Sequence, residues 1–176
     1  SDDVHKRWAK VVFFLLILTL AGCASSSEPK LKEVKKLDIA LVSQAMVNKD
    51  EQGRAAPLLI KVYELKSEAA FEAADFFDLQ KNDKNVLQQD LLEKDEFVLR
   101  PGDSQRIYRN GFPDTKVLGF IAEFRDLPRS VWRVSYKLLP SPEKSWYRSV
   151  LPNKKVKLRV EYDDNSIRIV EVDVSK

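Results

Sequence analysis

The sequence predicts a mainly β protein, a β-sandwich of about eight strands with a short helical insertion. Residues 132–138 and 155–162 show the alternation of apolar and polar residues that strands buried on one face require. Val134 and Leu158, for example, fall on the apolar side of this alternation. Residues 67–77 are rich in alanine and break the pattern. The alternation therefore favours packed sheets, and the alanine-rich segment favours a helix between strands.

The strands are expected where β-branched, aromatic and aliphatic residues run between turn-forming residues. Residues 116–124 are apolar on both faces, so we expect this strand at the centre of a sheet. Residues 163–166 predict a hairpin turn, and a shift in apolar phase between Ile169 and Val170 predicts a bulge. The expected strands are residues 37–47, 58–65, 97–100, 105–109, 116–124, 132–138, 155–162 and 167–174.

The helical insertion is expected over residues 67–77, with Ser67 as its N-cap and Glu68 in its first turn. One face of this helix is apolar and consists of Ala70, Phe71, Ala74 and Phe77. A second short helix is expected over residues 83–89. The aromatic run of Phe71, Phe76 and Phe77 favours a buried core over a ligand platform.

The first 22 residues are typical of a lipoprotein signal peptide. Basic residues precede an apolar run over residues 11–20, which is shorter than the roughly 20 residues that span a bilayer as a helix. Leu20-Ala21-Gly22-Cys23 then matches the bacterial lipobox, in which the chain is cut before a cysteine that receives lipid. The alternative is an uncleaved membrane anchor with a chance cysteine. We expect the signal peptide at residues 1–22, the lipidated cysteine and tether at 23–36, and the β-sandwich at 37–176.

Lipid on Cys23 would hold the chain on a membrane that faces the periplasm. Several acyl chains on one cysteine make such an attachment stable, whereas a single chain does not. Ala24 follows Cys23, in place of the Asp that resembles an inner-membrane retention signal in enteric bacteria. The outer membrane is therefore the expected location.

The rarest residues exclude most catalytic chemistry. His5 is the only histidine and Cys23 the only cysteine. After cleavage, the chain would have no imidazole, and its thiol would carry lipid. Cys/His metal sites, Ser-His-Asp triads and Cys-His dyads are thereby excluded. We predict that the protein is not an enzyme and uses no metal and no cofactor.

The remaining acidic pairs and the charge balance also favour binding over catalysis. Asp75 and Asp78 lie at an expected helix end, and Asp163 and Asp164 lie in an expected turn, where carboxylates are usually solvated. The 30 basic and 27 acidic residues are interleaved along the chain, so no nucleic-acid partner is expected.

Three sequence blocks resemble the TssJ family, the outer-membrane lipoproteins of the type VI secretion system. They are VYELKS leading into AAFEAADFFDLQKND (residues 62–83), FVLRPG (97–102) and GFIAEFRDLPRSVWR (119–133). The resemblance extends from the lipobox to the last hairpin. It implies a transthyretin-like β-sandwich with an added helical segment.

The resemblance also implies a partner, because TssJ proteins belong to a TssJ–TssL–TssM envelope complex and bind the periplasmic C-terminal part of TssM. The loop between the first two strands is implicated in that contact. In this chain the corresponding partner-binding residues are Asn48, Lys49, Asp50, Glu51, Gln52, Gly53 and Arg54. The sequence without the resemblance favours a solvated hairpin loop at this place.

We therefore interpret the chain as a scaffold without catalytic activity. The alternative is another periplasmic binding lipoprotein, either a pilotin of a different secretion system or a cell-wall-binding module. A lipid-anchored hydrolase ranks third, because the mature chain would lack histidine. If the first loop is not the docking site, residues 141–147 are the next candidate, with Trp146 and Tyr147 as aromatic anchors.

Overall fold

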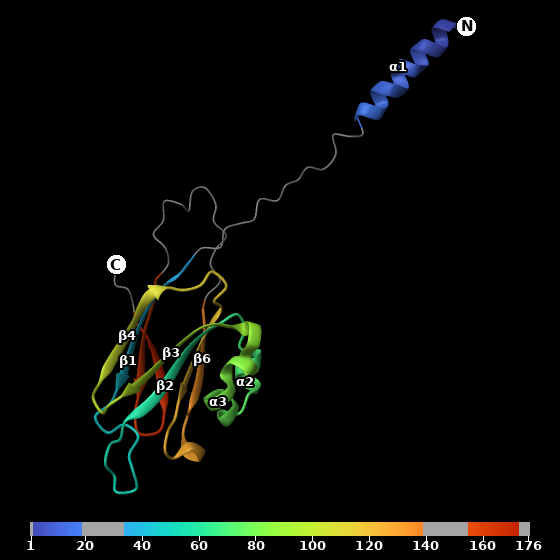
Figure 1. Cartoon of the computed structure of the whole chain (residues 1–176). Helices are drawn as coiled ribbons and strands as arrows, with labels where there is room; N and C mark the ends of the chain where they lie inside the picture. The colour runs from blue at the N-terminus through green and yellow to red at the C-terminus, as the bar shows by residue number, and fades with distance from the viewer. Residues whose placement is uncertain (1, 19–33, 139–154, 173–176) are drawn as a thin grey trace. The chain divides into compact units, whose positions relative to one another are not determined.

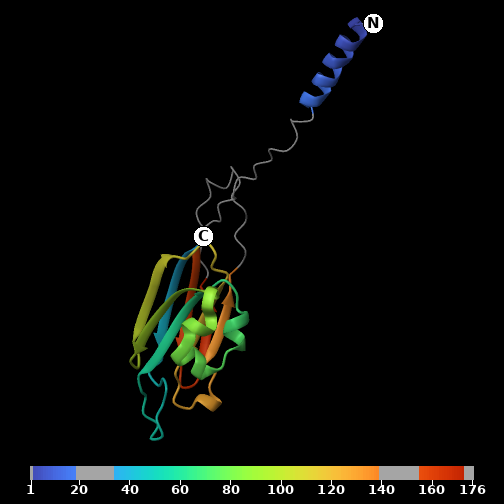
Figure 2. The same cartoon turned by 45° about the vertical axis from the view of Figure 1, so that its right-hand side comes forward.

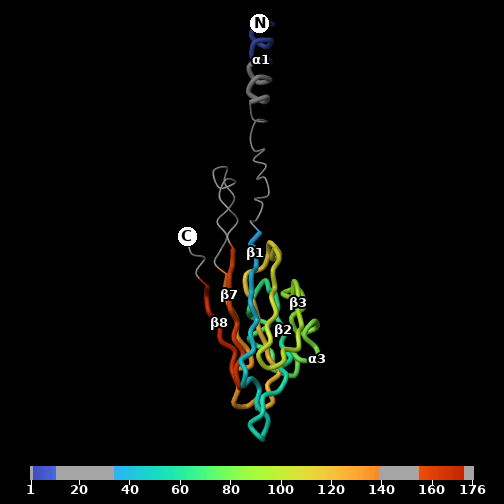
Figure 3. Tube along the Cα trace, turned by 90° about the vertical axis from the view of Figure 1, so that its left-hand side faces the viewer, coloured from blue at the N-terminus to red at the C-terminus, as the bar shows by residue number. Residues whose placement is uncertain are grey.

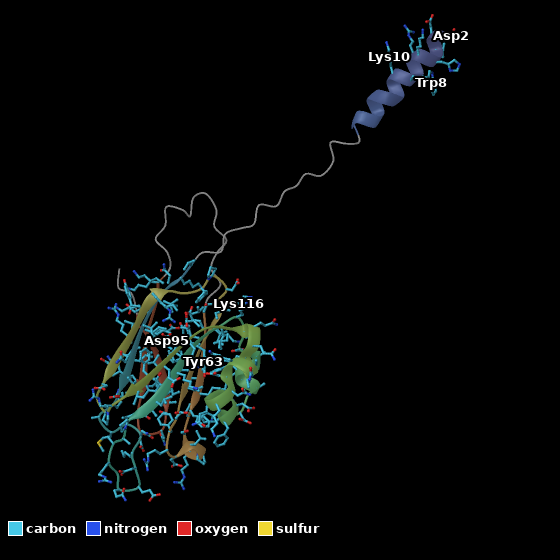
Figure 4. The ribbon with its side chains drawn as sticks, in the orientation of Figure 1. Asp2, Trp8, Lys10, Tyr63, Asp95 and Lys116 are labelled. Carbon is cyan, nitrogen blue, oxygen red and sulfur yellow. The ribbon has the colours of Figure 1, made fainter. Side chains whose placement is uncertain are left out.

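The computed structural model describes residues 2–18, 34–138 and 155–172. The chain divides into two compact units, Ser1–Lys30 and Leu31–Lys176. The first unit contains helix α1 (Asp2–Leu18), on which the expected basic and apolar parts of the signal peptide lie. The side chains of Asp2, Trp8 and Lys10 extend from this helix (Figure 4). No helix among the described residues has the length and apolar character needed to cross a membrane.

The second unit is a sandwich of two four-stranded sheets (Figure 1). Among the strands of the described residues, β1 and β7 pair in parallel, and the other paired strands run antiparallel. Sheet A contains, in spatial order, β4 (Ser104–Asn110), β1 (Lys36–Ser43), β7 (Lys155–Tyr162) and β8 (Ile167–Glu171). Sheet B contains β3 (Leu91–Leu99), β2 (Leu58–Leu65), β5 (Val117–Ala122) and β6 (Arg133–Lys137). The predicted fold class, a mainly β sandwich of about eight strands, is confirmed.

The main core fills the space between the sheets, because alternate residues of each strand point inward. Leu37, Ile39 and Leu41 of β1 are buried there, and so are Leu158 and Val160 of the neighbouring β7. The expected central strand, β5, is buried along its whole length between β2 and β6. Both cores that the described residues form lie within Leu31–Lys176, as expected of a unit that folds by itself.

Helices cover the outer face of sheet B, where a second core forms (Figure 2). They are α2 (Ala69–Ala73) and α3 (Phe76–Leu87), followed by a 3-10 turn, η1 (Gln88–Asp90). Helical residues Phe71, Leu79 and Leu87 pack there against Tyr63 and Ile121 of the sheet. The expected helical insertion therefore covers the outer face of sheet B.

The predicted helix bounds were wrong, because the helix is interrupted between residues 73 and 76. The Asp78 backbone N–H donates to the Asp75 side chain at 2.8 Å, so Asp75 caps a new helix instead of ending the first. Glu68 is the N-cap residue of α2 and forms no capping bond with its side chain. Ser67, the predicted N-cap, lies one residue earlier and accepts a bond from the Ala69 N–H at 3.2 Å.

A buried polar cluster fastens α3 to sheet B. The Asp83 carboxylate lies 3.0 Å from Lys94 Nζ and 3.5 Å from Lys61 Nζ. The hydroxyl of Tyr63 donates to the same carboxylate at 3.0 Å. Burial raises the pKa of Asp83, but the bonds from Lys94 and Tyr63 outweigh burial and keep the pKa below its ordinary value. Asp83 therefore stays ionised and holds the helix in place.

Several strand predictions also needed correction. Strand β1 ends at Ser43, and the apolar Val47 that extended the prediction is buried in the following turn instead. Strand β3 begins at Leu91, six residues before the predicted start. The bulge predicted at residues 169–170 was wrong, since β7 and β8 pair in continuous register. A register shift occurs instead between β2 and β3, where Glu64 pairs with Glu93 but Leu65 pairs with Leu91.

Candidate docking surface

The predicted docking loop joins β1 to β2 and stands at one end of the sandwich (Figure 1). The chain enters β1 at Lys36 and leaves it at Ser43, so the loop lies at the opposite end of this strand from Lys36. Seven steps of extended strand separate these two ends by about 23 Å. The loop and the start of β1 therefore lie at opposite ends of sheet A.

Most of the predicted partner-binding side chains are accessible. Lys49, Glu51, Gln52, Gly53 and Arg54 are exposed to solvent. They carry both charge signs on a short stretch of chain. This composition suits a polar interface rim more than an enclosed binding pocket.

Two of the predicted residues are less accessible: the Asp50 side chain is 16% exposed, and Asn48 is only 3% exposed. Its Nδ2 donates to the Pro57 carbonyl at 2.9 Å, and its Oδ1 accepts from the Arg125 N–H at 2.9 Å. Its own N–H donates to the Asp163 carbonyl at 3.3 Å. Asn48 adopts a left-handed backbone conformation, with φ at 49°, which Asn tolerates better than most residues. Asn48 therefore positions the loop, and its side chain is occupied by these bonds.

Asp50 gives the loop its internal shape. Its Oδ1 accepts from the backbone N–H groups of Gln52 and Arg54, each at 2.9 Å. Its Oδ2 accepts from Arg54 Nε at 3.1 Å, while its N–H donates to the Arg54 carbonyl at 2.8 Å. Gly53 completes the turn at a φ of 76°, which glycine adopts without strain. The backbone bond from Arg54 is the main reason why the pKa of Asp50 lies below its ordinary value.

Two further chain segments surround the loop, and sequence reasoning did not place them there. The β7–β8 turn contacts the loop because Asp164 Oδ1 accepts from the Lys49 N–H at 2.9 Å. The 3-10 turn η2 (Leu127–Arg129) joins the same end through Asn165, whose side chain donates to the Arg129 carbonyl at 3.4 Å. Met46 and Val131 are half exposed beside these turns. These apolar side chains had no periodic signal in the sequence.

The acidic pairs considered as catalytic candidates serve local structure. Asp75 caps α3, and Asp163 accepts bonds from the N–H groups of Asn165 and Ser166 in the hairpin turn. Of the aromatic run, Phe71 and Phe76 are buried, whereas Phe77 is 64% exposed. The described residues contain no group of three or more His, Cys, Asp or Glu side chains placed to hold a metal ion.

Cys23 and residues 141–147 lie outside the described residues. The lipidation site and the second candidate loop therefore stay predictions of the sequence.

The comparisons with known proteins agree with this arrangement. The family model described as "Type VI secretion lipoprotein, VasD, EvfM, TssJ, VC_A0113" matches residues 35–165. The solved T6SS lipoprotein TssJ1 from Pseudomonas aeruginosa is 35% identical, with a TM-score of 0.69 over 81% of this chain and 99% of that chain. Serratia marcescens Lip is 31% identical, with a TM-score of 0.66 over 78% of this chain and 98% of that chain.

A solved structure with lower sequence identity shares the fold, but it does not add evidence for the family. A chain of a structure described as a type VI membrane complex is 19% identical, with a TM-score of 0.64 over 78% of this chain and 99% of that chain. No curated protein matches the sequence. The family model covers most of the sandwich, and two solved lipoproteins match both its sequence and its fold. The chain belongs to the type VI secretion lipoprotein family, which includes TssJ.

Proposed function

We propose that this protein is a scaffold without catalytic activity, anchored to the outer membrane by lipid on Cys23. Its β1–β2 loop docks the periplasmic C-terminal part of TssM within a TssJ–TssL–TssM complex. The family supports the secretion system and the lipoprotein class. The partner and the docking site are the new parts of the proposal.

The observation that carries the docking site is the position of the loop. It lies at the end of the sandwich remote from Lys36. The proposed tether from Cys23 would join the domain at Lys36. An outer-membrane anchor therefore leaves this end accessible to a protein that reaches across the periplasm. The two solved relatives are described as a T6SS lipoprotein and as a membrane bound component of that system, which supports such an anchor.

The loop conformation is also fixed before a partner binds. Asn48 fixes its base to two neighbouring segments, and Asp50 fixes its tip. A partner that binds a pre-ordered loop loses less free energy to conformational ordering than one that binds a flexible chain. The exposed Lys49, Glu51 and Arg54 then present charges in a defined arrangement.

Titration calorimetry of residues 31–176 with the TssM periplasmic part tests the docking site. The loop variant removes two cations and one anion through Lys49→Ala, Glu51→Ala and Arg54→Ala. The matched control removes the same charges from exposed positions of α3 through Asp78→Ala, Lys81→Ala and Lys84→Ala. Interface hot spots cost about 2 kcal/mol or more each, so one such residue in the loop raises the Kd about thirtyfold.

The control variant should bind TssM like the wild type, and both variants should unfold at nearly the wild-type temperature. Full-strength binding by the loop variant rejects the loop as the docking site. Recovery of a secretin or of peptidoglycan, and not TssM, from an envelope extract supports the alternative of a pilotin or a cell-wall-binding module.

Mass spectrometry of the membrane-extracted protein tests the anchor. Cleavage before Cys23 and an acylated thiol are expected, and Cys23→Ser should leave an uncleaved or soluble precursor. Density-gradient fractionation then gives the membrane, and we expect the outer one. An unmodified Cys23 in the wild-type protein rejects this part of the proposal.

A further inference from the structure

The two outer faces of the sandwich differ in what covers them. Helices α2 and α3 pack on sheet B and bury its outer face. No described helix packs on the outer face of sheet A, where β8, β7 and β1 lie side by side (Figure 3). Because Leu37, Ile39, Leu158 and Val160 point inward, the residues between them point outward from this sheet.

The outward side chains of sheet A are mostly cationic. Strand pairing aligns them in rows, with Lys36 beside Lys155, and Arg106 and Arg159 on either side of Ala40. The described residues on this face include six cations and only two carboxylates, which leaves a formal charge of +4. We call this surface the basic face, and its cations are Lys36, Arg106, Lys155, Lys157, Arg159 and Arg168.

The two carboxylates lie beneath the cations. Asp38 is bound by Arg106 at 2.8 Å and by Lys155 at 3.3 Å, and its side chain is 6% exposed. Glu161 pairs with Arg159 and Arg168, and its side chain is 16% exposed. The side chain of Arg106 is 60% exposed and that of Arg168 is 71% exposed. The carboxylates therefore hold the cations in place, and the surface that a partner meets is positive.

An aromatic ring lies within the same face. Tyr108 is 48% exposed, with Lys36 Nζ 4.3 Å and the Arg106 guanidinium 4.4 Å from its ring centroid. Tyrosine combines an apolar ring with a polar hydroxyl and is common at the boundary between membrane and water. A surface of this composition suits lipid headgroups, which combine negative charge with a nearby apolar layer.

We propose that the basic face binds the anionic phospholipid headgroups of the leaflet that carries the lipidated Cys23. This inference rests on the anchoring part of the proposed function. Lys36 belongs to the basic face and also begins β1, 13 residues after Cys23. Those residues reach at most about 45 Å, so the tether keeps this face near the bilayer. Salt screens the attraction between these cations and the lipid headgroups beyond a Debye length of about 8 Å. The basic face must therefore lie against the bilayer surface to bind.

Binding through sheet A fixes the orientation of the domain. The strands of sheet A then lie along the membrane, and the β1–β2 loop at the end of β1 points sideways along the surface. TssM would reach the loop at the edge of the bound domain. The lipid holds the chain at the membrane, and the basic face determines how the domain sits there.

Vesicle co-sedimentation of residues 31–176 tests the inference without the lipid anchor. The domain should bind vesicles of equal parts phosphatidylglycerol and phosphatidylcholine, and should not bind vesicles of phosphatidylcholine alone. Added salt should release it. The variant Lys36→Gln with Lys157→Gln keeps the ion-pair partners of both carboxylates, Asp38 and Glu161. Since each cation near an anionic surface contributes a factor of about five, the loss of two cations should lower the partition constant about 25-fold.

The matched control is Lys81→Gln with Lys84→Gln, which removes the same charge from exposed positions on α3. It should bind the anionic vesicles like the wild type. Equal loss in the two variants, no binding by the wild type, or binding to purified peptidoglycan in place of the vesicles overturns the proposal. Calorimetry of the same variants with TssM separates the two hypotheses, because the basic face lies outside the docking loop and its loss should not change that affinity.

Discussion

The backbone N–H of Arg125 donates a hydrogen bond to the side chain of Asn48 at 2.9 Å, although 77 residues separate them in the chain. Asn48 begins the predicted docking loop, and Arg125 follows strand β5 of the other sheet. One buried amide therefore connects the loop to sheet B. The same side chain also binds the Pro57 carbonyl, at the far end of the loop.

Asn48→Ala should lower the free energy of unfolding by about 2–4 kcal/mol. It removes two buried side-chain bonds and forces alanine into a left-handed conformation. Asn48→Gly loses the same bonds but tolerates the positive φ, so it should be less destabilised than Asn48→Ala. Urea unfolding of both variants measures the difference. Wild-type stability of Asn48→Ala would contradict a positioning role.

The pH dependence of the loop should follow Asp50. Bonds to Arg54 keep the pKa of Asp50 below its ordinary 3.8. The ionised carboxylate therefore holds the loop fully above that ordinary value, and its contribution is lost as the pH falls through the lowered pKa. NMR shifts of the Gln52 and Arg54 amides should titrate together, with a midpoint below 3.8. Asp50→Asn should abolish this titration, and a midpoint above 3.8 in the wild type would disprove it.

The sequence predicted the sandwich best where alternation is strict and turns are clear. The bounds of β2 and β7 match the prediction because each alternates or runs apolar between polar turns. Strand β3 was mostly missed, since its residues Glu93 to Glu96 are charged on both faces at the edge of sheet B. The bulge was wrongly inferred from Val170, which is an apolar residue on the outer face in regular register.

The sequence located the loop between the first two strands, but it did not show the roles of the loop's residues. Asn48 and Lys49 looked equivalent, yet one is buried and the other exposed. The difference comes from partners far along the chain: Arg125 for Asn48 and Asp164 for Lys49. Local sequence propensity cannot predict contacts between residues that are far apart in the chain. The basic face was missed for a similar reason, because only strand pairing reveals which cations share a face and which carboxylates they cover.

Arg109→Met should destabilise the sandwich by about 3 kcal/mol. Arg109 of β4 in sheet A binds Glu64 and Asp95 of sheet B at 2.9 and 2.6 Å. Glu64 is 1% exposed, so losing Arg109 leaves a buried carboxylate without its counter-charge. Arg109→Met combined with Glu64→Gln should recover part of the loss. Arg100→Met, which breaks an exposed pair with Asp103, should cost less than about 1 kcal/mol in the same denaturation series.

Figure 4 labels Tyr63, which together with Gly119 of β5 lines the contact between sheet B and α2. Phe71 of α2 packs end-on against Gly119. A Cβ atom at residue 119 would lie 2.9 Å from Phe71 Cζ, closer than real contacts allow. The Phe71 ring is fully buried and lies 5.8 Å from the Tyr63 ring, so it has little room to move. Glycine at this position is what lets the helix approach the sheet.

Gly119→Ala should therefore destabilise the domain by about 1–3 kcal/mol through overpacking. Phe71→Leu shortens the side chain that would clash, so the double variant should be more stable than the sum of the two single losses predicts. Urea unfolding of the two single variants and the double variant measures this coupling. TssM affinity should stay at the wild-type value in all three under native conditions, because the docking loop lies outside this contact. Additive losses would show that Phe71 does not set the requirement for glycine.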